Sequence, residues 1–145
     1  MKYRREAQRV FARLETGDDV HASLAQIAER EGIGGGFVTA LGAVRDSVLG
    51  SYDLDRKEYE RTHFPDEMEL ASANGTISRH EGTPHLHLHA VLSDRRCRAF
   101  GGHLFSAKVA ATLEVFVQIA DGVIERTPDE ASGLALWRVG EEGEG

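Results

Sequence analysis

The sequence predicts an α+β fold, a single domain with a mainly antiparallel β-sheet and few helices. Many short apolar or alternating segments are separated by turn residues, and only one segment has clear helical spacing. The regular strand–helix alternation of a parallel sheet is missing from the pattern. The 145 residues suit one domain. We therefore expect one domain over residues 1–145, ordered over 3–139 and ending in an acidic tail at 140–145.

The first elements are a strand and the one clear helix. Residues 7–14 alternate between apolar and polar side chains, as a half-buried strand does. Asp18 or Asp19 suits a helix N-cap, and Gly32 supplies a stop signal. Between them, apolar residues recur at helical spacing, namely Val20, Leu24, Ile27 and Ala28. The spacing predicts a helix that packs one face against the sheet.

Strands and turns follow the helix. The apolar run at 37–41 ends at Gly42, which predicts a buried strand, and 47–52 predicts a second one. The charged stretch 53–66 predicts an exposed excursion with a strand at 59–64.

A hairpin is predicted next, from strands at 67–73 and 76–79 joined by Asn74-Gly75, because this pair favours a type I′ turn. The remaining expectations are a strand after Pro84, a polar turn at 93–96, a strand ending at Gly101-Gly102, an ambiguous segment at 106–111 that suits a helical turn, and strands at 112–119 and 134–139.

Histidines alternate with apolar residues after Pro84, at positions 85, 87 and 89. In a strand they share one face, while Leu86, Leu88 and Ala90 share the other. Residues i and i+2 lie about 6.6 Å apart along a strand, from which two imidazoles can converge on one ion. If a hairpin loop with an odd number of residues follows, for example 94–96, His103 lies directly opposite His87 on the same face. An even loop would place His103 on the other face.

Single features of this kind have an ordinary explanation. A lone histidine on a strand is more often solvated or hydrogen-bonded than a ligand, but three histidines at this spacing, the last beside Gly101-Gly102, favour a metal site. Glu114 lies in an apolar strand, and a buried carboxylate must be paired, protonated or metal-associated. It is a candidate catalytic acid or base if it faces the site, or else a member of a structural ion pair. Cys97 is expected to be a packing residue.

Composition excludes several classes of protein. The chain has 17 basic and 24 acidic residues and a formal charge of −7, which disfavours nucleic-acid binding through bulk positive charge. Its single cysteine cannot form an internal disulfide, which favours a reducing, cytoplasmic setting. The sequence lacks any apolar run near the ~20 residues of a membrane span.

Several motifs together resemble the PPC domain (plant and prokaryote conserved domain). They are Leu14-Glu15-Thr16-Gly17-Asp18-Asp19, Leu41-Gly42-Ala43-Val44, Leu49-Gly50-Ser51-Tyr52, the run from Glu69 to Ile77, His87-Leu88-His89-Ala90 and Gly101-Gly102-His103-Leu104. The resemblance implies a mostly antiparallel α+β fold similar to that of acetolactate decarboxylase, a homotrimer, and a metal, usually zinc, held by His87, His89 and His103. His85 is then the additional histidine. The Arg-Gly-Arg-Pro AT-hook of the plant members does not occur in the chain.

Three functional hypotheses follow. The first is a cytoplasmic homotrimer with zinc, or another divalent transition metal, on three histidines, acting as a lyase or hydrolase on a small anionic carbonyl compound. Three protein ligands leave a coordination position open, as in catalytic zinc sites. The alternative is a DNA-binding or regulatory protein without catalysis, in which the metal only organises the fold. A sensor that anchors a small molecule on the metal without turnover is a third reading.

Overall fold

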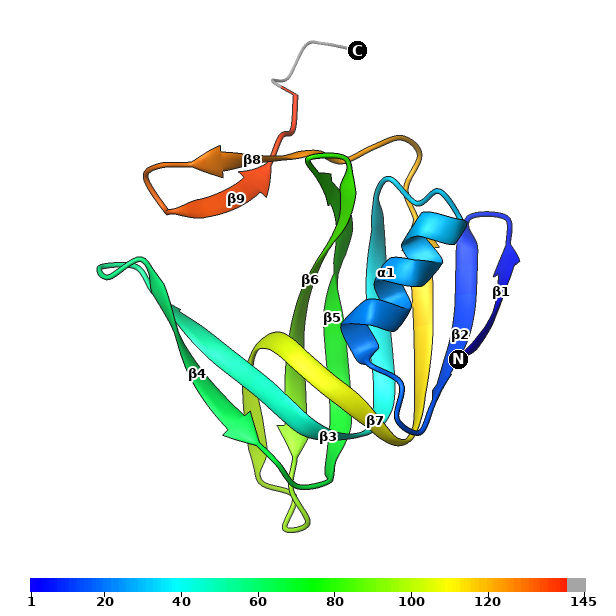
Figure 1. The fold of residues 1–145 in the computed structure, drawn as a ribbon, viewed down its shortest axis with the longest axis vertical. Coiled ribbons are helices and arrows are strands. Elements are labelled where there is room, and N and C mark those ends of the chain that lie inside the picture. The colour runs from blue at the N-terminus through cyan, green and yellow to red at the C-terminus, as the bar shows by residue number, and fades with distance from the viewer. Residues whose placement is uncertain (141–145) are drawn as a thin grey trace.

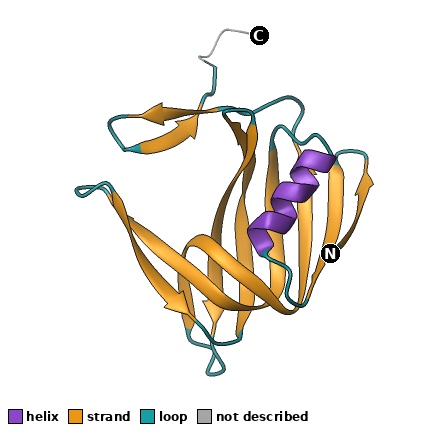
Figure 2. Cartoon of the chain, in the orientation of Figure 1, coloured by secondary structure: helices purple, strands orange, loops and turns teal. Residues whose placement is uncertain are grey.

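The computed structural model describes residues 1–140 and shows a curled antiparallel sheet with one helix and a small separate hairpin (Figures 1 and 2). This confirms the predicted α+β fold class. The elements in chain order are β1 (Lys2–Glu6), β2 (Arg9–Glu15), α1 (Val20–Arg30), β3 (Gly36–Asp53), β4 (Glu58–Phe64), β5 (Met68–His80), β6 (Thr83–Ser93), β7 (Ala99–Ile119), β8 (Arg126–Asp129) and β9 (Leu134–Trp137). Of the expected acidic tail at 140–145, residues 141–145 lie outside the described part of the chain.

Two long strands give the sheet its curvature. The seven-stranded sheet has the order β1-β2-β7-β6-β5-β3-β4, and β7 also pairs with β3. One half of β3 pairs with β5 and the other half with β4, while β7 pairs with β3 along most of its length. Because both strands take part at two places in the strand order, the sheet curls back on itself. Strands β8 and β9 form their own two-stranded sheet.

Helix α1 packs against one face of this sheet (Figure 1). Asp19 is the N-cap, and its Oδ1 accepts a hydrogen bond of 2.9 Å from the backbone N–H of Ala22. All four residues of the predicted apolar set are buried, and Ser23 is buried as well. The helix therefore begins at a predicted N-cap, ends just before Gly32, and buries the apolar face that the spacing predicted.

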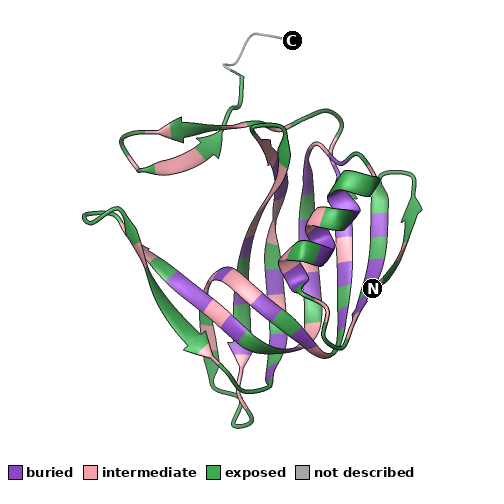
Figure 3. Ribbon diagram, in the orientation of Figure 1, coloured by how far each residue is buried: buried purple, intermediate pink, exposed green. Residues whose placement is uncertain are grey.

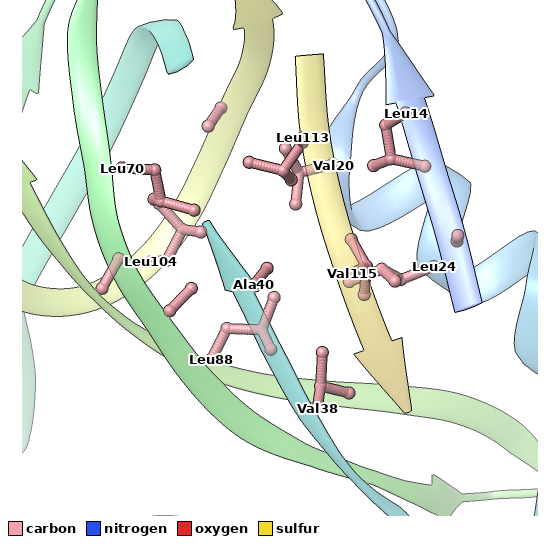
Figure 4. Packing of buried hydrophobic residues seen from close by; sticks show 14 of the residues in the cluster. Leu14, Val20, Leu24, Val38, Ala40, Leu70, Leu88, Leu104, Leu113 and Val115 are labelled. Carbon is pink, nitrogen blue, oxygen red and sulfur yellow. The ribbon is translucent and has the colours of Figure 1, made fainter. Parts of the chain in front are cut away.

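The core lies between α1 and the sheet. Figure 4 shows Leu24 and Val115 close together, and Figure 3 shows buried residues alternating with exposed ones along the strands. Leu88 and Leu113 are almost completely buried. The opposite face of the sheet is not covered by α1, and it carries the candidate site.

The predicted hairpin at Asn74-Gly75 is wrong. Strand β5 runs without interruption from Met68 to His80, and Gly75 lies opposite Leu88 of β6 and Val38 of β3. A Cβ atom on Gly75 would lie 2.1 Å from the carbonyl oxygen of His87. Glycine is therefore required here for the close approach of two strands and not for a turn. The turn between β5 and β6 is at Glu81-Gly82, where both φ angles are positive (50° and 78°).

Two predicted strand ends are also wrong. Gly42 does not end a strand but lies inside β3, where its φ of 148° accompanies a shift in register against β5. Likewise Gly101-Gly102 and the segment 106–111 are parts of the single strand β7, with no helical turn. The pattern of short strands therefore reflects bulges in two long strands. Strands β1 and β8 were not predicted.

Candidate metal centre

Strand β6 places its histidines as the alternation predicted. Leu88, Ala90 and Leu92 are buried on the α1 side, whereas His85, His87 and His89 project from the opposite face. The neighbouring positions of β5 on this face are polar and lie opposite them in turn: Asn74 opposite His89, Thr76 opposite His87 and Ser78 opposite His85.

The β6–β7 turn brings His103 to the same face. Its loop spans residues 94–98, five positions, between the paired residues Ser93 and Ala99. Asp94 organises this loop by accepting hydrogen bonds from the backbone N–H groups of Arg96 and Arg98, at 2.8 and 3.0 Å. The odd number of residues agrees with the prediction, but the partner does not. His103 lies opposite His89 and not His87, because the loop is two residues longer than in the example considered.

Three imidazoles therefore meet on one patch of sheet. Nitrogen atoms of His87, His89 and His103 all lie within 4.8 Å of one another. The Nε2 atoms of His87 and His89 are 3.2 Å apart, and the ring centroids of His87 and His103 are 5.3 Å apart. Two nitrogens bound to one tetrahedral zinc ion at ~2.0–2.1 Å are separated by roughly 3.3 Å. The His87–His89 spacing fits this geometry, and the third ring lies within 4.8 Å of the other two.

The electrostatics of the cluster favour neutral rings. Burial, together with the neighbouring His87 and His89, lowers the pKa of His103 to about 4. Burial is also the main reason why the pKa of His87 is below its ordinary value, with a further contribution from His89. A metal ion binds the neutral form of imidazole, so at neutral pH these two rings are in the protonation state that ligation requires.

A polar atom without a partner supports the same fit. The Nδ1 atom of His103 is buried and has no hydrogen-bond partner among the described residues, an arrangement that normally costs stability. The ring is fixed by aromatic packing instead, with its centroid 5.0 Å from that of Tyr59 and 4.5 Å from that of Phe105. The three residues thus have donor types and spacing that suit a zinc-like ion.

Two other predicted residues lie elsewhere. His85 is on the same face but outside the cluster, with its ring 6.2 Å from that of His80. Glu114 is exposed, so the expectation of a buried carboxylate is wrong. It lies on β7 between Arg13 and Leu41, eleven positions along the strand from His103, and the structure does not bring it to the histidines. A proton-transfer role for Glu114 stays a prediction.

Sequence reasoning missed the polar residues of β5 that border the site. Asn74 was assigned to a turn, and Thr76, whose buried Oγ1 has no partner among the described residues, was not considered. The alternation of Asn74, Thr76, Ser78 and His80 with other residues was a detectable strand signal.

Fold and site together define a small α+β protein with a candidate three-histidine metal centre on the open face of its sheet. Residues 1–121 match the model of the Plants and Prokaryotes Conserved (PCC) domain. The chain belongs to this family, as the sequence motifs indicated. No significant match was found among curated proteins.

Three solved structures illustrate the similarity of this chain to proteins with the same fold. A metal-containing protein from Archaeoglobus fulgidus is 34% identical, with 96% of this chain and all (100%) of that one covered and a TM-score of 0.84. A plant- and prokaryote-conserved (PPC) protein from Pyrococcus horikoshii is 26% identical, with 97% and 95% covered and a TM-score of 0.85. A Ralstonia eutropha protein provisionally described as DNA-binding is 25% identical, with 96% of each chain covered and a TM-score of 0.88.

A more distant structure confirms the predicted likeness to acetolactate decarboxylase at the level of the fold. It is a Staphylococcus aureus protein of unknown function described as similar to alpha-acetolactate decarboxylase. Identity is 16% and the TM-score 0.50, with 79% of this chain and 53% of that one covered.

Proposed function

We propose that this protein is a homotrimeric, cytoplasmic metal protein that holds zinc, or another divalent transition metal, on His87, His89 and His103. The convergence of these three imidazoles within 4.8 Å is the observation that carries the proposal. The Archaeoglobus fulgidus relative is described as metal-containing, which supports it further. All three histidines come from the β6–β7 hairpin, which is held in the sheet by pairing with β5 and β3.

The open position of such a site suggests its use. A divalent ion on three imidazoles can polarise a carbonyl group, which suits a lyase or hydrolase acting on a small anionic carbonyl compound. On this chain, His103 is held by Tyr59 and Phe105, which shield one side of the cluster from water. His89 is exposed and lies where a small molecule can enter from solvent.

Elemental analysis of protein purified without a histidine tag tests the metal centre. We expect about one divalent ion per chain. Substituting alanine for His87, His89 or His103 should weaken zinc affinity by more than about 100-fold, because even changes to residues behind the ligands cost about 10–100-fold. His85→Ala is the matched control and should retain the metal. Full occupancy of the His103→Ala variant would remove that residue from the site.

A DNA-binding role without catalysis is the second candidate, favoured by one structural feature. A groove of about 900 Å³ beside the β6–β7 turn is lined by four arginines, Arg45, Arg95, Arg96 and Arg98. Acidic residues share the groove, and Arg98 pairs with Asp94 at 2.6 Å. The net charge of −7 opposes contact with phosphates. A shift of duplex DNA by the purified protein at physiological salt, lost in an Arg95→Gln/Arg96→Gln variant, would make this the preferred function.

A further inference from the structure

The β8–β9 hairpin brings an arginine to the histidine-bearing face of the sheet. Arg126 donates one hydrogen bond from Nε to Oγ of Ser78, at 2.8 Å, and another from Nη1 to the carbonyl oxygen of Ala135, at 2.7 Å. Ser78 lies directly opposite His85 of β6, and His85 is two residues from His87 on the same strand. The guanidinium group is therefore held near His85, on the strand that also carries His87 and His89.

This cation has no anionic partner among residues 1–140. Arg126 is half-buried, and burial lowers its pKa, yet it takes part in no ion pair, whereas Arg79 and Arg98 each pair with a carboxylate. The groups near the guanidinium are the imidazole of His85 and the ring of Trp137, whose centroid is 6.0 Å from Cζ. A partly desolvated charge without a counter-charge is costly, and such groups normally have a partner.

The guanidinium also has unused hydrogen-bonding capacity. Of its five N–H groups, two are used by Ser78 and Ala135, and the other three have no partner in the described part of the chain. The Arg126 backbone is fixed as well, since Nδ1 of His80 donates to its carbonyl oxygen at 3.4 Å. A positioned guanidinium with free donors matches the geometry of a carboxylate.

The geometry points to Arg126 as the carboxylate-binding residue of a small ligand that reaches the three-histidine cluster. The ligand class is a short 2-hydroxy or 2-oxo acid, whose carboxylate contacts Arg126 and whose second oxygen faces the cluster. This inference rests on the proposed function, which it deepens by assigning the anionic end of the ligand. Arg126 lies in the C-terminal β8–β9 hairpin, beyond residues 1–121, which match the family model.

Calorimetric titration of zinc-loaded protein with glycolate, and with uncharged glycolamide, tests the subsite. Arg126→Gln should weaken glycolate binding by about 10- to 100-fold, as expected for hydrogen bonds to a charged group. Arg126→Lys keeps the charge and should lose less. The control Arg138→Gln removes an exposed arginine of the same C-terminal segment and should bind as the wild type does. Glycolamide should bind wild-type protein no better than glycolate binds Arg126→Gln.

Other results would overturn the inference. They are glycolate binding by Arg126→Gln at wild-type affinity, equal losses in Arg126→Gln and Arg138→Gln, and equal affinities for glycolate and glycolamide.

Ser78→Ala removes one anchor but leaves the guanidinium. It should weaken glycolate binding less than Arg126→Gln does. Zinc affinity, measured against a competing chelator, separates the two proposals. Zinc binding without glycolate binding defeats only the subsite, whereas wild-type protein that does not bind zinc defeats the proposed function.

Discussion

At the scale of single residues, the clustering of imidazoles determines their charge state. His103 is packed between Tyr59 and Phe105 and faces two further rings, so a proton on it would be both poorly solvated and close to other titratable nitrogens. This is why its pKa falls to about 4. A group of this kind contributes to stability only while it is neutral, which makes the metal-free protein sensitive to acid.

We expect the stability of chelator-treated protein to fall between pH 6.5 and about 4 because of His103. The pKa is lower in the folded than in the unfolded state, so the unfolded chain takes up the proton first and is favoured as the pH falls. One pKa unit is about 1.4 kcal/mol, so the loss is up to about 3 kcal/mol before solvent screening reduces it. Urea unfolding across this range should give a shallower pH dependence for His103→Asn. Parallel curves for the two proteins would contradict the assignment.

From the sequence, only those features of this site that depend on local residue spacing can be predicted. The i, i+2 pattern of His87 and His89 needs only the strand period, and the parity of the hairpin loop then decides the face of His103. The partner of His103 depends on loop length, which Asp94 sets through hydrogen bonds that no short-range pattern displays. Arg126 comes from a different sheet and reaches the site through tertiary contacts alone.

At the scale of elements, strands β5 and β6 approach each other closely at Gly75, beside the three-histidine cluster. Gly75 of β5 packs directly against the backbone of β6 at His87 and Leu88. The Asn-Gly pair was assigned to a turn because its local preference is strong. Pairing with strands on both sides overrides that preference, since a central strand satisfies the backbone hydrogen bonds of both residues. The same close packing fixes the position of His87 relative to its neighbours.

Gly75→Ala should therefore destabilise the protein by at least about 3 kcal/mol, at the upper end of what overpacking costs. The new Cβ atom would lie 2.1 Å from a backbone oxygen, so only a movement of the strand can relieve the clash. Gly101→Ala in β7 is the matched control, because its nearest neighbour would be 3.7 Å away. Its effect should stay within about 1 kcal/mol. Thermal unfolding of both variants makes the comparison, and equal stabilities would show that β5 and β6 can separate without cost.

At the scale of the whole molecule, the sheet has one face covered by α1 and one that remains open. Away from the histidines, on β2 and β3, the open face presents large apolar side chains, with Phe11, Phe37 and Leu41 exposed by 39%, 50% and 56%. A groove of about 680 Å³ is lined by two of them, Phe11 and Leu41, together with Phe116. Exposed apolar patches of this kind mark interaction surfaces. We propose that a second copy of the chain is the partner that covers this patch. Among residues 1–140, no helix has the length and apolar character needed to cross a membrane.

Leu41→Glu should disrupt the proposed trimer, because it places a carboxylate inside the apolar patch, beside Glu114 on the neighbouring strand. Burying two unpaired like charges at an interface costs several kcal/mol, enough to dissociate a trimer at micromolar concentration. Sedimentation velocity should show three 15.9-kDa chains for the wild type and single chains for the variant. Leu54→Glu changes an even more exposed leucine, 70% accessible in the β3–β4 loop outside the patch, and should remain trimeric. A wild-type protein that sediments as one chain, or a Leu41→Glu variant that stays trimeric, would place the subunit contact elsewhere or remove it.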